Sequence, residues 1–225
     1  MKKVMRIFTV AAIAFGMTMA VSCNKDPEEN GGNGGNGGNG GNGGGNTENL
    51  PTTIDENFNS GLPSAWTAVD ADGDGYNWVA SGESWFATDP NVGASYAPFG
   101  VDNTECMLSA SYRNDVGELQ TDNFLVMPKI YVEEGSNLSF SIASYQVEYA
   151  DSYSVVVGTL QNGTFTVTGT LMDTQVASTG IREGTGFTTK TVSLNEYKGQ
   201  GIYIAFRHNC SDCYWLILDN VKVSK

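Results

Sequence analysis

Three aspartates at alternate positions, followed by a glycine, form the pattern in this sequence that points most directly to chemistry. They are Asp70, Asp72 and Asp74, within the segment VDADGDGYNW. Calcium prefers several oxygen ligands, and alternate carboxylates in a turning loop can converge on one ion. A complete EF-hand loop would also need a bidentate glutamate at its last position, where Ser81 stands. The segment therefore predicts either a partial calcium site or a tight turn that uses Asp and Gly for their backbone preferences.

The cysteines and the single histidine are the next candidates. Cys210 and Cys213 form a C-x-x-C pair just after His208, and Cys106 lies far upstream. These four residues include half of a zinc motif, whereas exported cysteines more often pair as disulfides. We expect a disulfide between Cys210 and either Cys213 or Cys106. Any Ser-His-Asp or Cys-His chemistry would have to use His208, for which we expect a structural hydrogen-bonding role instead.

Composition and missing motifs disfavour other classes of protein. The formal net charge of −13 argues against a nucleic-acid partner, because phosphate binding needs basic side chains. The same charge suits divalent cations, and plain solubility explains it equally well. The sequence contains no G-x-S-x-G elbow and no phosphate-binding glycine loop. It also marks no pair of carboxylates held about 5–10 Å apart, as a glycosidase requires. We therefore expect a protein that is not an enzyme.

Residues 1–22 have the features of a bacterial lipoprotein signal peptide. A basic start precedes an apolar run over residues 7–21, which is too short to span a membrane. Small residues precede Cys23, the arrangement in which a peptidase cuts before the cysteine and its thiol takes a diacylglycerol. We expect lipidation of Cys23 and anchoring at the outer membrane, on the cell surface. An ordinary signal peptide that is cut nearby is the alternative.

Residues 23–49 are expected to form a flexible linker. Acidic side chains close to Cys23 resemble the export signal of Bacteroidetes surface lipoproteins. The following run, GGNGGNGGNGGNGGGN, has no side chains that could bury apolar surface, so it cannot fold. As a random coil of about 16 residues it would span roughly 20–24 Å, enough to lift a folded head clear of a membrane.

Residues 50–225 are expected to form one domain, a monomeric head. The segments NLSFSIASY, SYSVVVGT, GTFTVTGT and GIYIAFRH alternate with period two, which is typical of half-buried strands. Turn signals such as EEGSN, QNG and YKGQG separate them, and no helical periodicity is sustained. The pattern predicts an all-β fold, an antiparallel β-sandwich of the jelly-roll type.

Four longer segments carry a resemblance to a known family. In chain order, GLPSAWTAVDADGDGYNW, CMLSASYRNDVGELQTDNFLVMPKI, YADSYSVVVGT and YKGQGIYIAFRHNCSDCYWLILDNVKV resemble the cleaved adhesin domains attached to gingipain proteases. The resemblance covers nearly the whole domain. It implies a jelly-roll sandwich of the galactose-binding or concanavalin-like kind, structural calcium, and a role in adhesion or in binding host proteins or glycans. It does not imply proteolysis.

The resemblance also implies a second place for calcium. In related jelly-rolls the first and last strands are neighbours, and a carboxylate from each commonly closes a calcium site. Here the candidates are Asp55 or Glu56 with Asp219, and Asp102 and Asn103 are able to supply further oxygens. The resemblance further implies that three tryptophans fill the core and that the TDNF segment is a structural turn; the tryptophans are Trp66, Trp78 and Trp215.

Aromatic side chains in the first half of the domain are candidates for a ligand face. Sugar rings stack on tryptophan and tyrosine faces in carbohydrate-binding jelly-rolls, and Trp85 and Tyr96 lie among polar and glycine residues, although core packing explains such aromatics too. We expect an adhesin-like surface binding module for host proteins or glycans. A structural subunit of a surface assembly and a jelly-roll glycoside hydrolase are the alternatives.

Overall fold

The computed structural model describes residues 49–83 and 100–225. The chain divides into two units, Met1–Gly44 and Gly45–Lys225. The predicted signal peptide and all but the last residue of the predicted linker lie outside the described residues, as do Cys23, Trp85 and Tyr96. No helix in the described part of the chain combines the length and the apolar character that a membrane span requires.

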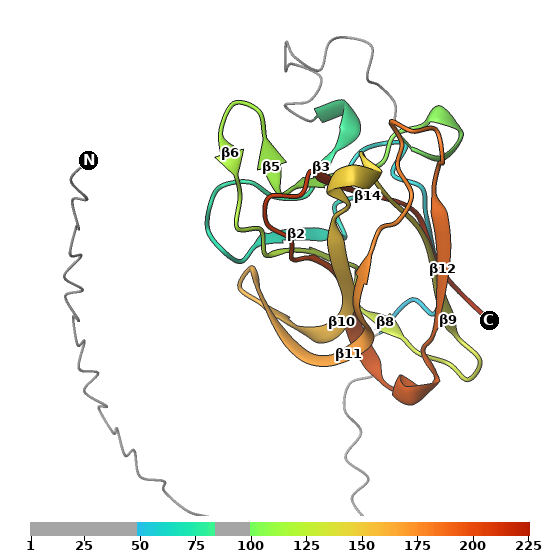
Figure 1. The fold of residues 1–225 in the computed structure, drawn as a ribbon. Coiled ribbons are helices and arrows are strands. Elements are labelled where there is room, and N and C mark those ends of the chain that lie inside the picture. Colours follow the sequence, from blue (N-terminus) through green and yellow to red (C-terminus); the bar gives the residue numbers. More distant parts are fainter. Residues whose placement is uncertain (1–48, 84–99) are drawn as a thin grey trace, which may run out of the picture. The chain divides into compact units, whose positions relative to one another are not determined.

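Two antiparallel sheets form the domain, as the sequence predicted (Figure 1). The first sheet has the order β12 (Thr188–Ser193), β9 (Asn137–Ser144), β14 (Trp215–Ser224), β4 (Met107–Ala110) and β3 (Val79–Ala80), and β1 (Ile54–Glu56) also pairs with β14. The second sheet has the order β11 (Thr164–Val176), β10 (Ser152–Gln161), β13 (Gly201–His208), β7 (Asn123–Val126) and β2 (Thr67–Asp70), and β8 (Ile130–Tyr131) also pairs with β13.

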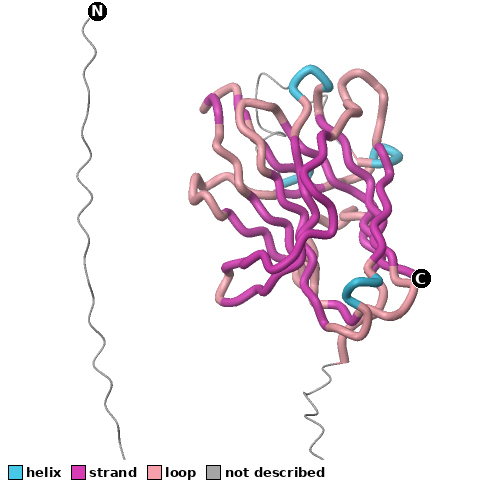
Figure 2. Tube along the Cα trace, turned by 60° about the horizontal axis from the view of Figure 1, so that its bottom comes forward, coloured by secondary structure: helices cyan, strands magenta, loops and turns pink. Residues whose placement is uncertain are grey.

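Short elements complete the described chain. A two-stranded ribbon joins β5 (Tyr112–Arg113) to β6 (Gly117–Glu118). The helical segments in Figure 2 are single 3₁₀ turns between strands. They cover Ser81–Glu83, Val101–Asn103, Val147–Tyr149 and Asn195–Tyr197.

The main core lies between the sheets and follows from the two-residue period of the strands. In β14, Leu216 and Leu218 face this core, while Trp215 and Ile217 face a smaller cluster on the other side of the same sheet. Each large apolar side chain buried in this way contributes about 1.5–3 kcal/mol relative to an exposed one. All three predicted core tryptophans are buried, which confirms that prediction.

One expectation about burial was wrong, because β10 is buried on both faces rather than on one. Every residue from Tyr153 to Gly158 is buried. On the outer face, Phe165 from the β10–β11 hairpin packs with Val156 and Phe124 in a third cluster. A Cβ at Gly158 would lie 2.6 Å from the Phe165 ring, so only glycine fits beneath that ring. The hairpin therefore covers a face that the sequence pattern assigned to solvent.

The first and last strands are neighbours, as the resemblance implied. β1 runs antiparallel to β14, with Asp55 opposite Lys222 and Glu56 opposite Val221. The pairing of β14 with β9 is irregular between Asp219 and Lys222, a β-bulge. Residue Asn220 within it has a φ of +48°, in the left-handed region that asparagine tolerates. The bulge places Asp219 beside the end of β1.

Candidate functional site

Asp219 is a fully buried carboxylate in β14. Its Oδ2 accepts a hydrogen bond from the backbone N–H of Val101 (2.7 Å), and its Oδ1 accepts one from the N–H of Asn220 (2.6 Å). The Val101 loop fits closely around it, since a Cβ on Gly100 would lie 2.8 Å from Asp219 Oδ2 and 2.5 Å from the carbonyl oxygen of Thr104. These contacts fix the orientation of the carboxylate.

Two further carboxylates lie near enough to act on Asp219. Burial raises the pKa of Asp219 to about 6, and the charges of Asp102 and Glu56 act in the same direction, against the two backbone hydrogen bonds. Among the ion pairs of the described residues, none involves Asp219. A buried carboxylate with two like-charged neighbours is an arrangement that a divalent cation stabilises, and carboxylates with loop carbonyls are ligands that calcium prefers. Glu56 and Asp102 thus act on Asp219 through their charges, but these three carboxylates are not among the groups of described residues whose ligand atoms all lie within 4.8 Å of one another.

Asp55 makes a different contact from its neighbour Glu56. Its Oδ2 lies 2.9 Å from the Nζ of Lys222, the residue opposite it on β14, and both side chains are largely exposed. Successive side chains of a strand point to opposite faces. Of the two carboxylates in β1, Glu56 is the one that raises the pKa of Asp219.

The aspartate triad begins at Asp70, the last residue of β2, and continues into the loop that follows. One carboxylate oxygen from each of Asp70, Asp72 and Asp74 lies within 4.8 Å of the others, so the triad could bind a metal ion. The loop is also a tight turn, in which the two Asp70 oxygens accept hydrogen bonds from the N–H groups of Gly73 (2.7 Å) and Gly75 (2.9 Å). Both glycines have φ near +80°, which explains why glycine stands there. The predicted tight turn is therefore present. Its carboxylate oxygens also have free lone pairs with which they could bind a cation.

A hollow of about 430 Å³ lies beside the loop that joins β13 to β14. We call it the tyrosine hollow; its lining residues are Tyr112, Asn114, Gln146, Tyr149, Arg182, Asp212, Cys213 and Tyr214. Tyr149 is 48% exposed, and Tyr214 stacks on the buried ring of Trp215 with centroids 4.5 Å apart. Aromatic faces with a few polar groups are typical of ligand sites, so the hollow can stack a planar or sugar-like ring and bind its polar edge.

A second hollow, of about 540 Å³, lies next to Asp219. The loop Gly100–Asn103 forms one wall, and Ile181, Phe187 and Thr189 lie among the other lining residues. Asp102 therefore lines this hollow and also acts on Asp219.

His208 is fully buried and makes the structural hydrogen bonds that we expected of it. Its Nδ1 lies 2.8 Å from the Oγ of Ser109, and its Nε2 lies 3.0 Å from the Oδ1 of Asp151. Both partners are buried as well. These residues have the types of a Ser-His-Asp triad, but a nucleophile must reach its substrate and Ser109 is only 1% exposed. The three residues form a buried polar network.

The two cysteines of the C-x-x-C pair form a disulfide, Cys210–Cys213. Of the two pairings that the sequence left open, the structure has this one. Cys106 is buried in the cluster of Leu108 and Trp215. A Cys3His zinc set is not assembled, because the sulfurs of Cys210 and Cys213 are bonded to each other and the ring of His208 binds Ser109 and Asp151.

Sequence reasoning missed the tyrosine hollow. Its lining comes from β5, the turn Val147–Tyr149, the loop around Arg182 and the loop that carries Cys213. Each segment by itself has the sequence of an ordinary turn, and exposed tyrosines are the one local signal for a ligand site there. The aromatic residues that the sequence analysis predicted for a ligand face, Trp85 and Tyr96, lie outside the described residues.

The sequence of the domain matches a known family and proteins that contain it. The sequence profile of the Cleaved Adhesin Domain family matches residues 51–223. Hemagglutinin A of Porphyromonas gingivalis W83 is 34% identical over 185 residues, which cover 76% of this chain and 8% of that protein. Lys-gingipain W83 of the same species is 31% identical, again over 76% of this chain and 10% of that protein. The chain thus spans about a tenth or less of the length of these relatives.

Solved structures agree with the sequence comparison. The K1 cleaved adhesin domain of Lys-gingipain from Porphyromonas gingivalis W83 superposes with a TM-score of 0.61 and 27% identity, over 77% of this chain and 98% of that domain. The K3 cleaved adhesin domain gives a TM-score of 0.60 and 32% identity, over 76% and 96%. The match therefore covers nearly all of each single adhesin domain. This chain belongs to the cleaved adhesin domain family.

Proposed function

We propose that this protein is an adhesin-like binding module that is held on the cell surface by a lipid anchor, is stabilised by calcium, and binds host proteins or glycans. The observation that carries the proposal is the tyrosine hollow. Half-exposed Tyr149, the side chain of Arg182 and the stacked ring of Tyr214 together offer a face for stacking and groups for hydrogen bonding. The hollow contains no histidine, and the protein's single histidine is buried, which favours binding over catalysis.

Calcium serves in this proposal as a structural ion. Glu56, Asp102 and Asp219 would tie β1, the loop after residue 99 and β14 together, so an ion there would stabilise the wall of the second hollow. The aspartate triad is the second candidate for an ion.

The anchor rests on the sequence around Cys23 and on the glycine-rich linker that follows it. Growth of the native host with a labelled fatty acid should give a labelled protein, and Cys23→Ala should remove the label. A protein that stays unlabelled, or a variant that keeps the label, would contradict lipidation of Cys23.

Binding should be measured first with the purified protein on an array of glycans and host matrix proteins, once in calcium and once in chelator. A bound ligand that is lost in chelator would support a calcium-stabilised adhesin. If nothing on the array binds in either buffer, that result would count against adhesion and favour the structural-subunit alternative. Turnover of a glycan on the array would favour the hydrolase.

Two matched variants locate the binding site. Tyr149→Ala removes an exposed ring from the tyrosine hollow, and Tyr131→Ala removes a similarly exposed ring from β8, which pairs with the opposite end of β13. Loss of one stacking ring should weaken binding roughly tenfold, whereas the control should leave it unchanged. Equal effects of the two variants would place the ligand elsewhere.

A further inference from the structure

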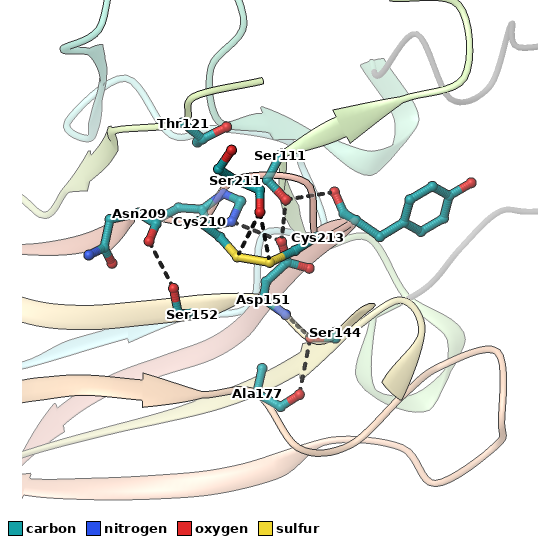
Figure 3. Close-up of a disulfide and its surroundings, with 12 residues drawn as sticks. Ser111, Thr121, Ser144, Asp151, Ser152, Ala177, Asn209, Cys210, Ser211 and Cys213 are labelled. Atoms are coloured by element: carbon teal, nitrogen blue, oxygen red, sulfur yellow. Dashed lines mark hydrogen bonds and ion pairs between the residues drawn. A yellow bond between two sulfur atoms is a disulfide. The ribbon is translucent and has the colours of Figure 1, made fainter. Parts of the chain in front are cut away.

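The Cys210–Cys213 disulfide lies against a buried carboxyl group. A carboxylate oxygen of Asp151 and the two sulfurs all lie within 4.8 Å of one another. Asp151 immediately precedes β10 and is fully buried, while both cysteines are partly exposed. Figure 3 shows the Asp151 side chain beside the sulfur–sulfur bond. The disulfide therefore has one side toward solvent and one side toward an acid–base group.

One oxygen of this carboxyl group has no hydrogen-bond partner. Asp151 Oδ1 accepts a hydrogen bond from Ser111 Oγ (2.7 Å) and contacts His208 Nε2 (3.0 Å), but Oδ2 has none among the described residues. Leaving a buried polar atom unpaired costs roughly 1–3 kcal/mol, and such atoms often mark functional sites. The network on Oδ1 holds the group in place, and Oδ2 stays available.

The loop that carries the disulfide is also held by contacts that do not need the sulfur–sulfur bond. The backbone N–H of Thr121 donates to the carbonyl oxygen of Cys210 (3.2 Å), and Ser211 Oγ donates to Glu118 Oε1 (2.6 Å). Ser152 Oγ donates to the carbonyl oxygen of Asn209 (2.8 Å). These contacts would keep the two sulfurs close together after the bond opens.

The two sulfurs differ in their surroundings. Cys213 lines the tyrosine hollow together with Asp212 and Arg182, and Cys210 does not. We therefore expect a thiol that enters the hollow to attack the Cys213 sulfur rather than that of Cys210, and the guanidinium of Arg182 to attract the thiolate form that attacks disulfides.

We propose that Cys210–Cys213 is a thiol–disulfide exchange site, which takes thiol-bearing molecules through the tyrosine hollow and holds them as mixed disulfides on Cys213. The partner's thiolate attacks the Cys213 sulfur, a new sulfur–sulfur bond forms, and the Cys210 sulfur leaves as a thiolate. The Cys210 thiolate then takes up one proton, which balances the proton that the partner's thiol lost when it became a thiolate. The partner sulfur is oxidised and Cys210 is reduced, so no other oxidant is needed.

Asp151 acts in the return step. It accepts the proton of the Cys210 thiol, and the resulting thiolate attacks the Cys213 sulfur and expels the partner's thiolate, which regains the proton. The disulfide is thereby restored and the capture is reversible. This chemistry does not depend on the proposed adhesion, since it needs only a thiol.

The first test compares the purified protein with a synthetic peptide of residues 206–216 that carries the same disulfide. Each is incubated with reduced glutathione, or with a soluble protein that has one exposed cysteine, then quenched in acid and mapped by mass spectrometry. The folded protein should react roughly tenfold faster than the peptide, with the adduct on Cys213. Reaction slower than the peptide, or adducts shared equally between Cys210 and Cys213, would overturn the proposal. The faster of the two thiols identifies the kind of partner.

The second test uses Asp151→Asn, with Ser152→Ala as its neighbour control. Asp151→Asn should lengthen the lifetime of the mixed disulfide roughly tenfold. Ser152→Ala, which loosens the same loop without changing the carboxyl group, should leave that lifetime unchanged. An unchanged lifetime in a folded Asp151→Asn variant would exclude the role of Asp151. If Asp151→Asn does not fold, the rate of adduct formation in the protein relative to the peptide still tests the proposed exchange site.

Discussion

The backbone N–H of Val101 donates a hydrogen bond of 2.7 Å to the Oδ2 of Asp219, joining residues that lie 118 positions apart. Because Asp219 is fully buried and the bond is short, the conformation of the Gly100–Thr104 loop depends on the carboxylate of Asp219. The loop also brings Asp102 toward Asp219 and Glu56. One carboxylate thus organises both the loop and the candidate calcium site.

Asp219→Asn should therefore remove the stabilisation that calcium gives at this site. A ligand at 100 times its dissociation constant stabilises a folded protein by about 2.7 kcal/mol, which for a domain of this size raises Tm by roughly 5–10 °C. We expect such a rise for the unmodified protein in calcium relative to chelator, and a clearly smaller rise for Asp219→Asn, in which only the aspartate triad could still bind the ion. Asp55→Asn serves as the control, since Asp55 pairs with Lys222, and it should keep the rise. Equal losses in the two variants would contradict this assignment.

The raised pKa of Asp219 predicts how the stability of the calcium-free protein depends on pH. The folded protein holds a proton on Asp219 up to about pH 6, whereas the unfolded chain releases it near the ordinary value of 3.8. Folding is therefore favoured at low pH, and this contribution is lost as the pH rises through about 6.

In chelator, the contribution of Asp219 to the free energy of unfolding should be larger at about pH 5 than at about pH 7. Calcium binds the ionised carboxylate, so the stabilisation that calcium adds should be larger at about pH 7. The measurement is urea unfolding across this range with and without Asp219→Asn, because the difference removes the other carboxylates from the comparison. A slope that is unchanged by the substitution would show that another group titrates.

The sequence predicted the fold well because period-two strands and turn signals are local. Segments such as GIYIAFRH became β13 with the predicted bounds. It could not predict that β10 is buried on both faces, because the covering ring of Phe165 reaches it only through the hairpin. Likewise, the pattern around His208 did not reveal Asp151, which lies 57 positions away in sequence and 3.0 Å away in space.

Candidate sites were predictable only where one segment held the whole pattern. The aspartate triad was found because its residues are alternate. Glu56 and Asp219 required the resemblance, which implied that the first and last strands are neighbours. The tyrosine hollow gathers four segments that are far apart in sequence, and no local rule connects Tyr112 with Arg182.

A two-point ion pair joins Asp122, the residue before β7, to Arg207 in β13, and its geometry predicts that lysine cannot replace arginine. Arg207 Nε and Nη2 donate to the two oxygens of Asp122 (2.6 and 2.9 Å), and its guanidinium lies 5.4 Å from the Phe124 ring centroid. Arg207→Lys keeps the charge but loses one hydrogen bond and the stacking, so it should cost about 1 kcal/mol in urea unfolding. Lys222→Gln, which breaks a single exposed ion pair, should cost less than about 0.5 kcal/mol. Equal costs would argue against the two-point geometry.

The buried network of His208 predicts non-additive stability changes. His208→Leu removes the partner of both Ser109 and Asp151 and should cost about 3 kcal/mol, because two buried polar groups lose a hydrogen bond. Ser109→Ala should cost about 1 kcal/mol by itself. Ser109 Oγ keeps the hydrogen bond from Asn123 Nδ2 (3.3 Å) in His208→Leu but loses its bond to the imidazole. The double variant lacks that hydroxyl, so the total should fall below the sum of the single costs by about 1 kcal/mol. Urea unfolding of the four proteins measures this coupling. Additive costs would mean that His208 and Ser109 do not stabilise each other, and that the imidazole is held mainly by Asp151.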